Sequence, residues 1–85
     1  MENQYKIYHK EDKDLYINVE CHYYKLIDAK KVYRDSKNND SLDDTIIFEF
    51  GRDGEKQIEA IFTLGVDEGE KFALALLNLC HSIKR

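Results

Sequence analysis

The sequence predicts an α+β domain in which a single antiparallel sheet of four to five strands, built from two hairpins, packs on one long C-terminal helix. Apolar and polar residues alternate in Leu15–Tyr24 and again on both sides of a turn in Thr45–Leu64. The spacing changes to that of a helix in Val66–Arg85. No repeat or linker interrupts the 85 residues, so we expect one domain, 1–85, with one core.

Two short alternating segments predict the first hairpin. Gln4–His9 indicates a strand, and the charged segment Lys10–Asp14 indicates a turn. In Leu15–Tyr24, Leu15, Ile17, Val19, Cys21 and Tyr23 share one face, while Tyr16, Asn18, Glu20, His22 and Tyr24 share the other. A strand with one buried face is typical of an antiparallel sheet.

Residues 25–37 fit two structures. Leu26, Ala29, Val32 and Tyr33 fit a helical stripe, whereas Ile27, Ala29, Lys31 and Tyr33 fit a strand. Intrinsic preferences balance, and a small sheet of hairpins slightly favours a third strand around Lys30–Arg34. The polar segment Asp35–Asp44 predicts a loop.

The second hairpin allows a prediction of register. A three-residue loop, 52–54, with Gly54 in the left-handed region would place Phe48 opposite Ile58 and Ile46 opposite Ala60. A two-residue turn would mix apolar and polar residues on each face, so we expect the longer loop.

The C-terminal segment predicts the helix around which the core forms. Asp67 is a candidate N-cap residue that forms a capping box with Glu70. The expected core stripe consists of Phe72, Leu76, Leu79, Cys80 and Ile83. Hairpins followed by one long helix resemble the pleckstrin-homology-like superfold, which normally has seven strands, and a fold-level analogy carries no function.

Composition sets the broad class. The formal net charge of −4 argues against a general polyanion binder. The N-terminal residues lack the apolar region of a signal peptide, and no segment is long and apolar enough to span a membrane. We therefore expect a cytoplasmic protein without a membrane partner. Heavy use of Lys, Asn, Ile, Asp and Tyr indicates an AT-rich bacterial or phage gene.

No residue pattern predicts catalysis, a cofactor or a metal site. The dipeptides Cys21-His22 and Cys80-His81 suggest zinc, but neighbouring residues diverge on strands and helices, and four ligands must converge. We expect both thiols to be buried and both imidazoles to be exposed. Glu49 and Glu59 share one face but look solvated, and no nucleophile motif or phosphate loop is present.

A basic segment supplies the alternative function. Lysines and arginines lie beside three tyrosines, a composition that suits single-stranded nucleic acid: Lys25, Lys30, Lys31, Arg34 and Lys37 with Tyr23, Tyr24 and Tyr33. Acidic residues follow at once and cancel this charge, so we do not expect nucleic acid to be the partner. The alternative remains a small-ligand, lipid or single-stranded nucleic-acid binding module that uses this Tyr/Lys surface.

Protein contact is the function that the sequence favours. The helix is apolar over more than one face, because Leu74 lies beside His81 and away from the core stripe. The sheet face that the helix should leave open carries Tyr8, Tyr16, Tyr24, Ile47 and Ile61. We predict a small non-enzymatic protein-binding domain, a regulator, inhibitor or adaptor. Its partner is another protein, with a homodimer as one form of this prediction.

Overall fold

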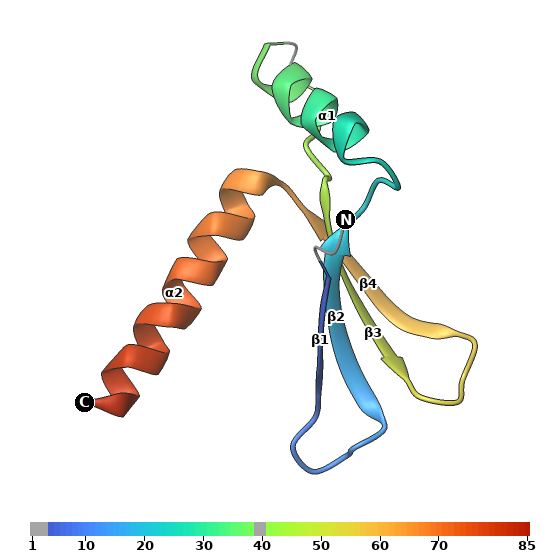
Figure 1. Cartoon of the computed structure of the whole chain (residues 1–85), viewed down its shortest axis with the longest axis vertical. Coiled ribbons are helices and arrows are strands. Elements are labelled where there is room, and N and C mark those ends of the chain that lie inside the picture. Colours follow the sequence, from blue (N-terminus) through green and yellow to red (C-terminus); the bar gives the residue numbers. More distant parts are fainter. Residues whose placement is uncertain (1–3, 39–40) are drawn as a thin grey trace.

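The computed structural model describes residues 4–38 and 41–85, and in them it shows one four-stranded sheet and two helices (Figure 1). The predicted α+β class, with a single antiparallel sheet and a long C-terminal helix, is confirmed. The sheet order is β1-β2-β3-β4, the order of the strands in the chain. The elements are β1 (Tyr5–Tyr8), β2 (Leu15–Cys21), α1 (Leu26–Asn38), β3 (Ile46–Arg52), β4 (Ile58–Leu64) and α2 (Val66–Lys84).

The first hairpin forms as predicted. β1 pairs antiparallel with β2, and Tyr8 lies opposite Tyr16. The His9 ring accepts hydrogen bonds from the amides of Glu11 and Asp12 at 3.1 and 3.0 Å, which stabilises the charged turn. β2 ends at Cys21, earlier than the alternation suggests, so the residues that follow do not continue either sheet face.

The ambiguous segment is the helix α1, and the slight preference for a third strand was wrong. Ala29 is the buried residue of this helix. Asp28 in its first turn and Lys37 in its last suit the helix dipole, and Lys31 pairs with Asp35 one turn away at 3.4 Å. The predicted loop 35–44 therefore starts only after Asn38, and its residues 39 and 40 lie outside the described residues.

The second hairpin forms with a register different from the predicted one. Phe48 lies opposite Phe62 and Ile46 opposite Leu64. The connection between β3 and β4 spans residues 53–57, and the register shifts between Phe50 and Gly51. The longer connection and this irregularity move the partner residues. Gly54 has φ +85°, so its predicted left-handed conformation is confirmed.

The pairing gives the sheet two distinct faces. We call the side towards α2 the helix-side face, and the residues that alternate onto it are Tyr5, Ile7, Leu15, Ile17, Val19, Cys21, Ile46, Phe48, Phe50, Ala60, Phe62 and Leu64, with Arg52 at the far end of β3. The opposite side is the outer face, which carries Lys6, Tyr8, Tyr16, Asn18, Glu20, Ile47, Glu49, Gly51, Ile61 and Thr63. The helix-side face is almost wholly apolar, as a core face should be.

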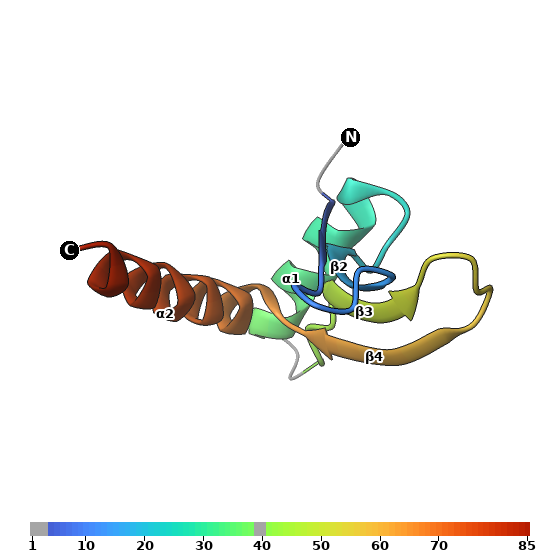
Figure 2. The ribbon, with the colours of Figure 1, turned by 90° about the horizontal axis from the view of Figure 1, so that it is seen from below.

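The helix α2 begins at the sheet and then diverges from it, so the two form an open angle (Figures 1 and 2). No residue of α2 is buried, and the expectation of a core helix was wrong for the single chain. The radius of gyration is 14.9 Å, whereas a compact chain of this length has about 12 Å. The described part contains four strands, in contrast to the seven of the pleckstrin-homology-like arrangement.

Neither α1 nor α2, the helices of the part that the structure describes, combines enough length and apolar character to cross a bilayer.

Candidate interaction surface

An open apolar groove lies between the helix-side face and the first half of α2. Its volume is about 550 Å³. Phe72 of α2 meets Phe48 of β3 edge-on, with ring centroids 5.8 Å apart and planes at 74°. Further along the chain, α2 has moved away from the sheet (Figure 1). The groove is lined by Tyr5, Ile17, Val19, Ile46, Phe48, Val66, Gly69, Glu70, Phe72, Ala73 and Leu76.

The apolar surface continues beyond the groove. On α2, the exposed fractions of Leu76, Leu79 and Ile83 are 52%, 58% and 75%, although these residues form the stripe that was expected to be core. The exposed fractions of Tyr5 and Phe62 on the edge strands are 66% and 61%. Large apolar side chains are thus exposed on both α2 and the helix-side face of the sheet, a pattern that marks a contact surface.

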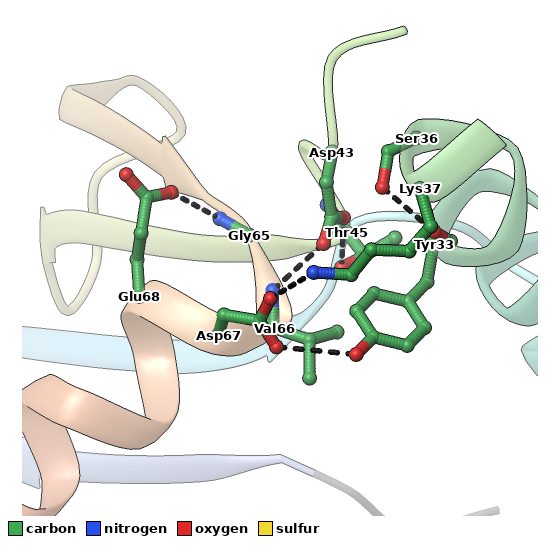
Figure 3. Close-up of polar contacts among 9 residues, drawn as sticks. All are labelled: Tyr33, Ser36, Lys37, Asp43, Thr45, Gly65, Val66, Asp67 and Glu68. Carbon is green, nitrogen blue, oxygen red and sulfur yellow. Dashed lines mark hydrogen bonds and ion pairs between the residues drawn. The ribbon is translucent and has the colours of Figure 1, made fainter. Parts of the chain in front are cut away.

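The direction of α2 is set by polar contacts at its first turn (Figure 3). The carboxylate of Asp43 accepts a hydrogen bond from the amide of Val66 at 2.9 Å and another from the Thr45 hydroxyl at 2.7 Å. The side chain of Glu68 accepts a hydrogen bond from the amide of Gly65 at 3.0 Å. The predicted capping by Asp67 and Glu70 was therefore wrong, because the N-cap is Gly65, two residues earlier, and the carboxylate of Asp43 in the preceding loop binds the first helical amide.

Asp67 instead joins α2 to α1. Its carboxylate accepts a hydrogen bond from the Tyr33 hydroxyl at 3.1 Å and forms an ion pair with Lys37 (Figure 3). The bond to Lys37 lowers the pKa of Asp67, and the bond to Asp67 raises the pKa of Tyr33 and of Lys37. α1 and the start of α2 are thus held together, at the end of the molecule where the groove closes.

The outer face brings together part of the predicted tyrosine surface. The rings of Tyr8 and Tyr16 pack edge-on, with centroids 5.9 Å apart, and the ammonium group of Lys6 lies 4.2 Å from the centre of the Tyr16 ring. Ile47 and Ile61 also alternate onto this face, but Ile47 lies opposite Glu20 and Ile61 opposite Glu49, away from the two tyrosines. The outer face is therefore mixed, with a small tyrosine patch at one end and two separate isoleucines among charged groups.

The other predicted contact residues lie elsewhere. Tyr24 is fully exposed in the turn after β2, away from the outer face. Leu74 and His81 lie exposed on α2. The sequence assigned Phe72, Leu76, Leu79 and Ile83 to the core and so missed their exposure. The available signal was the apolar character of α2 on more than one side, which a single sheet cannot cover.

Two carboxylates on the outer face are closer than the sequence suggests. Glu20 on β2 and Glu49 on β3 are diagonal neighbours in the sheet register. A hydrogen bond with the Glu20 side chain, followed by partial burial and like-charge repulsion, raises the pKa of Glu49. Beside them, Asn18 is buried and accepts a hydrogen bond from the Gln4 side chain at 3.1 Å. This polar centre separates the tyrosine patch from the end of the sheet near α1.

The cysteines lie in different surroundings. Cys21 on β2 is half-buried, whereas Cys80 on α2 is exposed, so the expectation that Cys80 is buried was wrong for the single chain. Within residues 4–38 and 41–85, no three histidine, cysteine or acidic side chains converge as metal ligands. The basic segment also makes contacts within the chain: the Tyr23 hydroxyl donates to Asp44 at 2.7 Å, and Lys31 and Lys37 pair with carboxylates.

A comparison of the chain with models of protein families, with curated proteins and with solved structures found no match.

Proposed function

We propose that this protein is a small non-enzymatic domain that acts by binding protein through the helix-side face and α2. The observation that carries the proposal is the size of its open surface. The chain has 7173 Å² of accessible surface, whereas a compact protein of 10.1 kDa has about 5,300 Å². The excess of about 1,900 Å² is more than twice the 800 Å² or so that one partner buries in a standard protein complex.

The chemistry of the surface also suits a protein partner. The exposed residues on both sides of the groove are leucine, isoleucine and aromatic side chains, and Glu70 is the charged residue of its lining. The buried centre of a protein interface has this character, with charged residues at the rim. The role of a regulator, inhibitor or adaptor in a bacterial or phage cytoplasm belongs to the same proposal and rests on composition alone.

Capture experiments with two matched variants test the proposal. Leu79→Glu places a charge on the apolar side of α2, and Ser82→Glu places the same charge on its polar side. We expect proteins captured by the parent, including other copies of the chain, to be retained by Ser82→Glu and lost by Leu79→Glu. Identical capture by all three folded proteins would contradict binding through α2.

The tyrosine patch is the second surface in this proposal. Replacing Tyr16 and Tyr24 with serine should leave the far-ultraviolet circular dichroism spectrum unchanged, because Tyr24 is fully exposed and Tyr16 lies on the outer face. If Tyr16 in the patch and Tyr24 beyond it are anchors, the double variant should weaken the contact by about 2 kcal/mol, as for an interface hot spot. A folded double variant with unchanged capture would restrict the binding surface to the helix-side face and α2.

The alternative is a small-ligand, lipid or single-stranded nucleic-acid binding module that uses the Tyr/Lys surface. The contacts of Tyr23, Tyr33, Lys31 and Lys37 within the chain give it less support than the open apolar surface gives protein binding. Titration of single-stranded nucleic acid at increasing salt discriminates the two, because affinity from phosphate contacts falls steeply with salt. Absence of binding at low salt would remove the nucleic-acid form of the alternative.

A further inference from the structure

We propose that the occupant of the groove is a second copy of this chain, so that two copies pack reciprocally, each placing its α2 in the groove of the other. This inference rests on the proposed function, because it names the partner of the same surface. The surface has two parts, an open groove beside the first half of α2 and the exposed apolar second half of the same helix, and each chain carries both. A two-fold axis fills both grooves and covers both helices at once, because the α2 of each copy then packs in the groove of the other.

The area of the open surface agrees with a stable dimer. Two copies that each bury the excess of about 1,900 Å² would form an interface of about 3,800 Å² in total, which lies within the range of about 2,000–5,000 Å² for obligate homodimers. A transient contact would need far less. The scarcity of buried residues supports the same conclusion, because Ala29 is the buried apolar residue of the described part of the chain.

The distribution of apolar residues on α2 requires neighbours on two sides. Phe72, Leu76 and Leu79 lie within about 60° of one another around the helix axis. Leu77 and Leu74 are turned by about 140° and 200° from Phe72. In the reciprocal arrangement, one side of α2 meets the helix of the second copy and the other approaches its sheet. A helix that covered only its own sheet would need one apolar stripe.

Charge complementarity indicates that the two helices run antiparallel. The first two turns of α2 carry Asp67, Glu68 and Glu70 together with one cation, Lys71, and the end of the helix carries Lys84 and Arg85. Asp67 is occupied by Lys37 and Glu68 by the amide of Gly65, which leaves Glu70 for a partner, turned by about 100° from Lys71 around the helix axis. An antiparallel pair crossing near the middle of the helices brings the basic end of each close to the acidic start of the other, where opposite charges attract and both dipoles are favourable.

Light scattering after size-exclusion chromatography, from about 1 to 100 µM chain, tests the second copy. We expect the parent and Ser82→Glu to have twice the 10.1 kDa chain mass, and Leu79→Glu to have the mass of one chain with its helical spectrum retained. A dissociation constant raised by about tenfold or more is the expected effect, because a charge would enter the apolar contact. A parent with the mass of one chain throughout, or a Leu79→Glu variant as dimeric as the parent, would overturn the inference.

If Leu79→Glu fails to fold, the melting temperature of the parent at several chain concentrations still tests whether a second copy binds. The melting temperature of a dimer rises with chain concentration, and that of a single chain does not. A constant melting temperature therefore overturns the second copy. If a parent with the mass of one chain still captures a different protein that Leu79→Glu loses, the proposed function stands and only the choice of partner fails.

A charge exchange tests the antiparallel orientation. Glu70→Lys and Lys84→Glu should each weaken the dimer, and the two changes in one chain should restore it, because opposite ends then attract again. The control is Lys71→Glu combined with Lys84→Glu, which replaces positive with negative charge at both ends of the helix instead of exchanging the two signs, and should not restore the dimer. Failure of the exchanged variant to recover would contradict the antiparallel arrangement.

Discussion

The first turn of α2 and the remainder of this helix differ in the partners that their side chains find within the chain. At the first turn, polar groups meet polar groups of the same chain: Val66 is capped by Asp43, and Asp67 binds Tyr33 and Lys37. In the remainder, apolar side chains have little to meet within the chain. The polar contacts are short-range and directional, and they determine the direction of the helix. The exposed apolar side chains determine that the surface that covers the helix should be apolar.

The energies of the two regions differ in size. A single hydrogen bond at the first turn contributes about 1 kcal/mol net, and an exposed ion pair contributes about 0–1 kcal/mol. Burying one leucine or phenylalanine side chain contributes about 1.5–3 kcal/mol. Several such side chains are exposed along α2, so covering the helix should stabilise the protein more than the contacts that orient it.

The largest expected effect comes from Leu76→Ala. If α2 is covered by a second copy, this change removes packed volume and should lower the free energy of unfolding by about 2–5 kcal/mol. In a single chain Leu76 is 52% exposed, and the cost should be only about 1 kcal/mol. Urea unfolding at low and high chain concentration separates these values. A small cost at every concentration would mean that the helix is not covered.

Next in size is Gly65→Ala, which disturbs the polar region. A methyl group at this position would lie 2.8 Å from a carboxylate oxygen and 3.0 Å from the backbone oxygen of Asp43. Because the backbone cannot yield easily, we expect a loss of about 1–3 kcal/mol in urea unfolding.

The matched control is Gly69→Ala, one turn later on the same helix. Its methyl group would meet Ile46 at 3.7 Å and Leu64 at 3.8 Å, which are ordinary contacts. Alanine should therefore stabilise the helix by up to about 1 kcal/mol relative to glycine. Equal losses at both positions would show that the contact with Asp43 does not fix the start of α2.

A smaller effect is expected at the hairpin turn, far from both regions. Gly54 has φ +85°, a conformation that costs a residue with a side chain about 1 kcal/mol, and the space around it is open. Gly51→Ala would place a methyl group 2.7 Å from the Tyr16 hydroxyl oxygen. Because the tyrosine can shift, we expect this change to cost less and to alter the Tyr8–Tyr16 packing. Urea unfolding of both variants checks the order, and a larger cost for Gly51→Ala would reverse it.

The smallest effects are pH-dependent and have opposite signs. The pKa of Asp67 is lowered, so its contribution to stability is present above the ordinary pKa of an aspartate and is lost as pH falls through the lowered value. The pKa of Glu49 is raised, so its contribution is present at low pH and is lost as pH rises through the raised value. Melting temperatures between about pH 3 and 7 should show a flatter acid response for Asp67→Asn. The melting temperature of Glu49→Gln should exceed that of the parent most near neutral pH. Dependences of melting temperature on pH with the opposite signs would contradict these contacts.

The sequence was sufficient where a pattern is local. The alternation of Leu15–Tyr24 predicted β2 and its faces, although the strand ends at Cys21, and the glycine after Asp53 predicted a positive φ. The sequence was insufficient where a structural feature depends on residues that are far apart in the chain. The strand register depends on an irregularity at Phe50 and Gly51 and on a longer connection, and neither has a distinct residue signature.

The candidate surface was predicted only in part, for the same reason. Tyr8, Tyr16, Ile47 and Ile61 follow from strand periodicity and do share a face. The apolar character of α2 on more than one side was a signal of its exposure, but the direction of the helix could not be predicted, because it depends on Asp43, a residue of a loop without periodicity. Helical spacing shows which side chains of a helix lie together, and it does not show whether the chain itself provides their cover.

The order of the strands has a consequence for how the protein reaches its final state. β1 with β2 and β3 with β4 form local hairpins, which close quickly, whereas β2 and β3 pair across the whole of α1 and so close a longer loop. All of these steps lie within one chain, so the rate of sheet formation should be independent of concentration. In the proposed dimer, covering α2 with a second copy would be a bimolecular step, and its rate would rise with concentration. Between the two steps the apolar side of the sheet is bare, and this interval is when the chain is most exposed to aggregation.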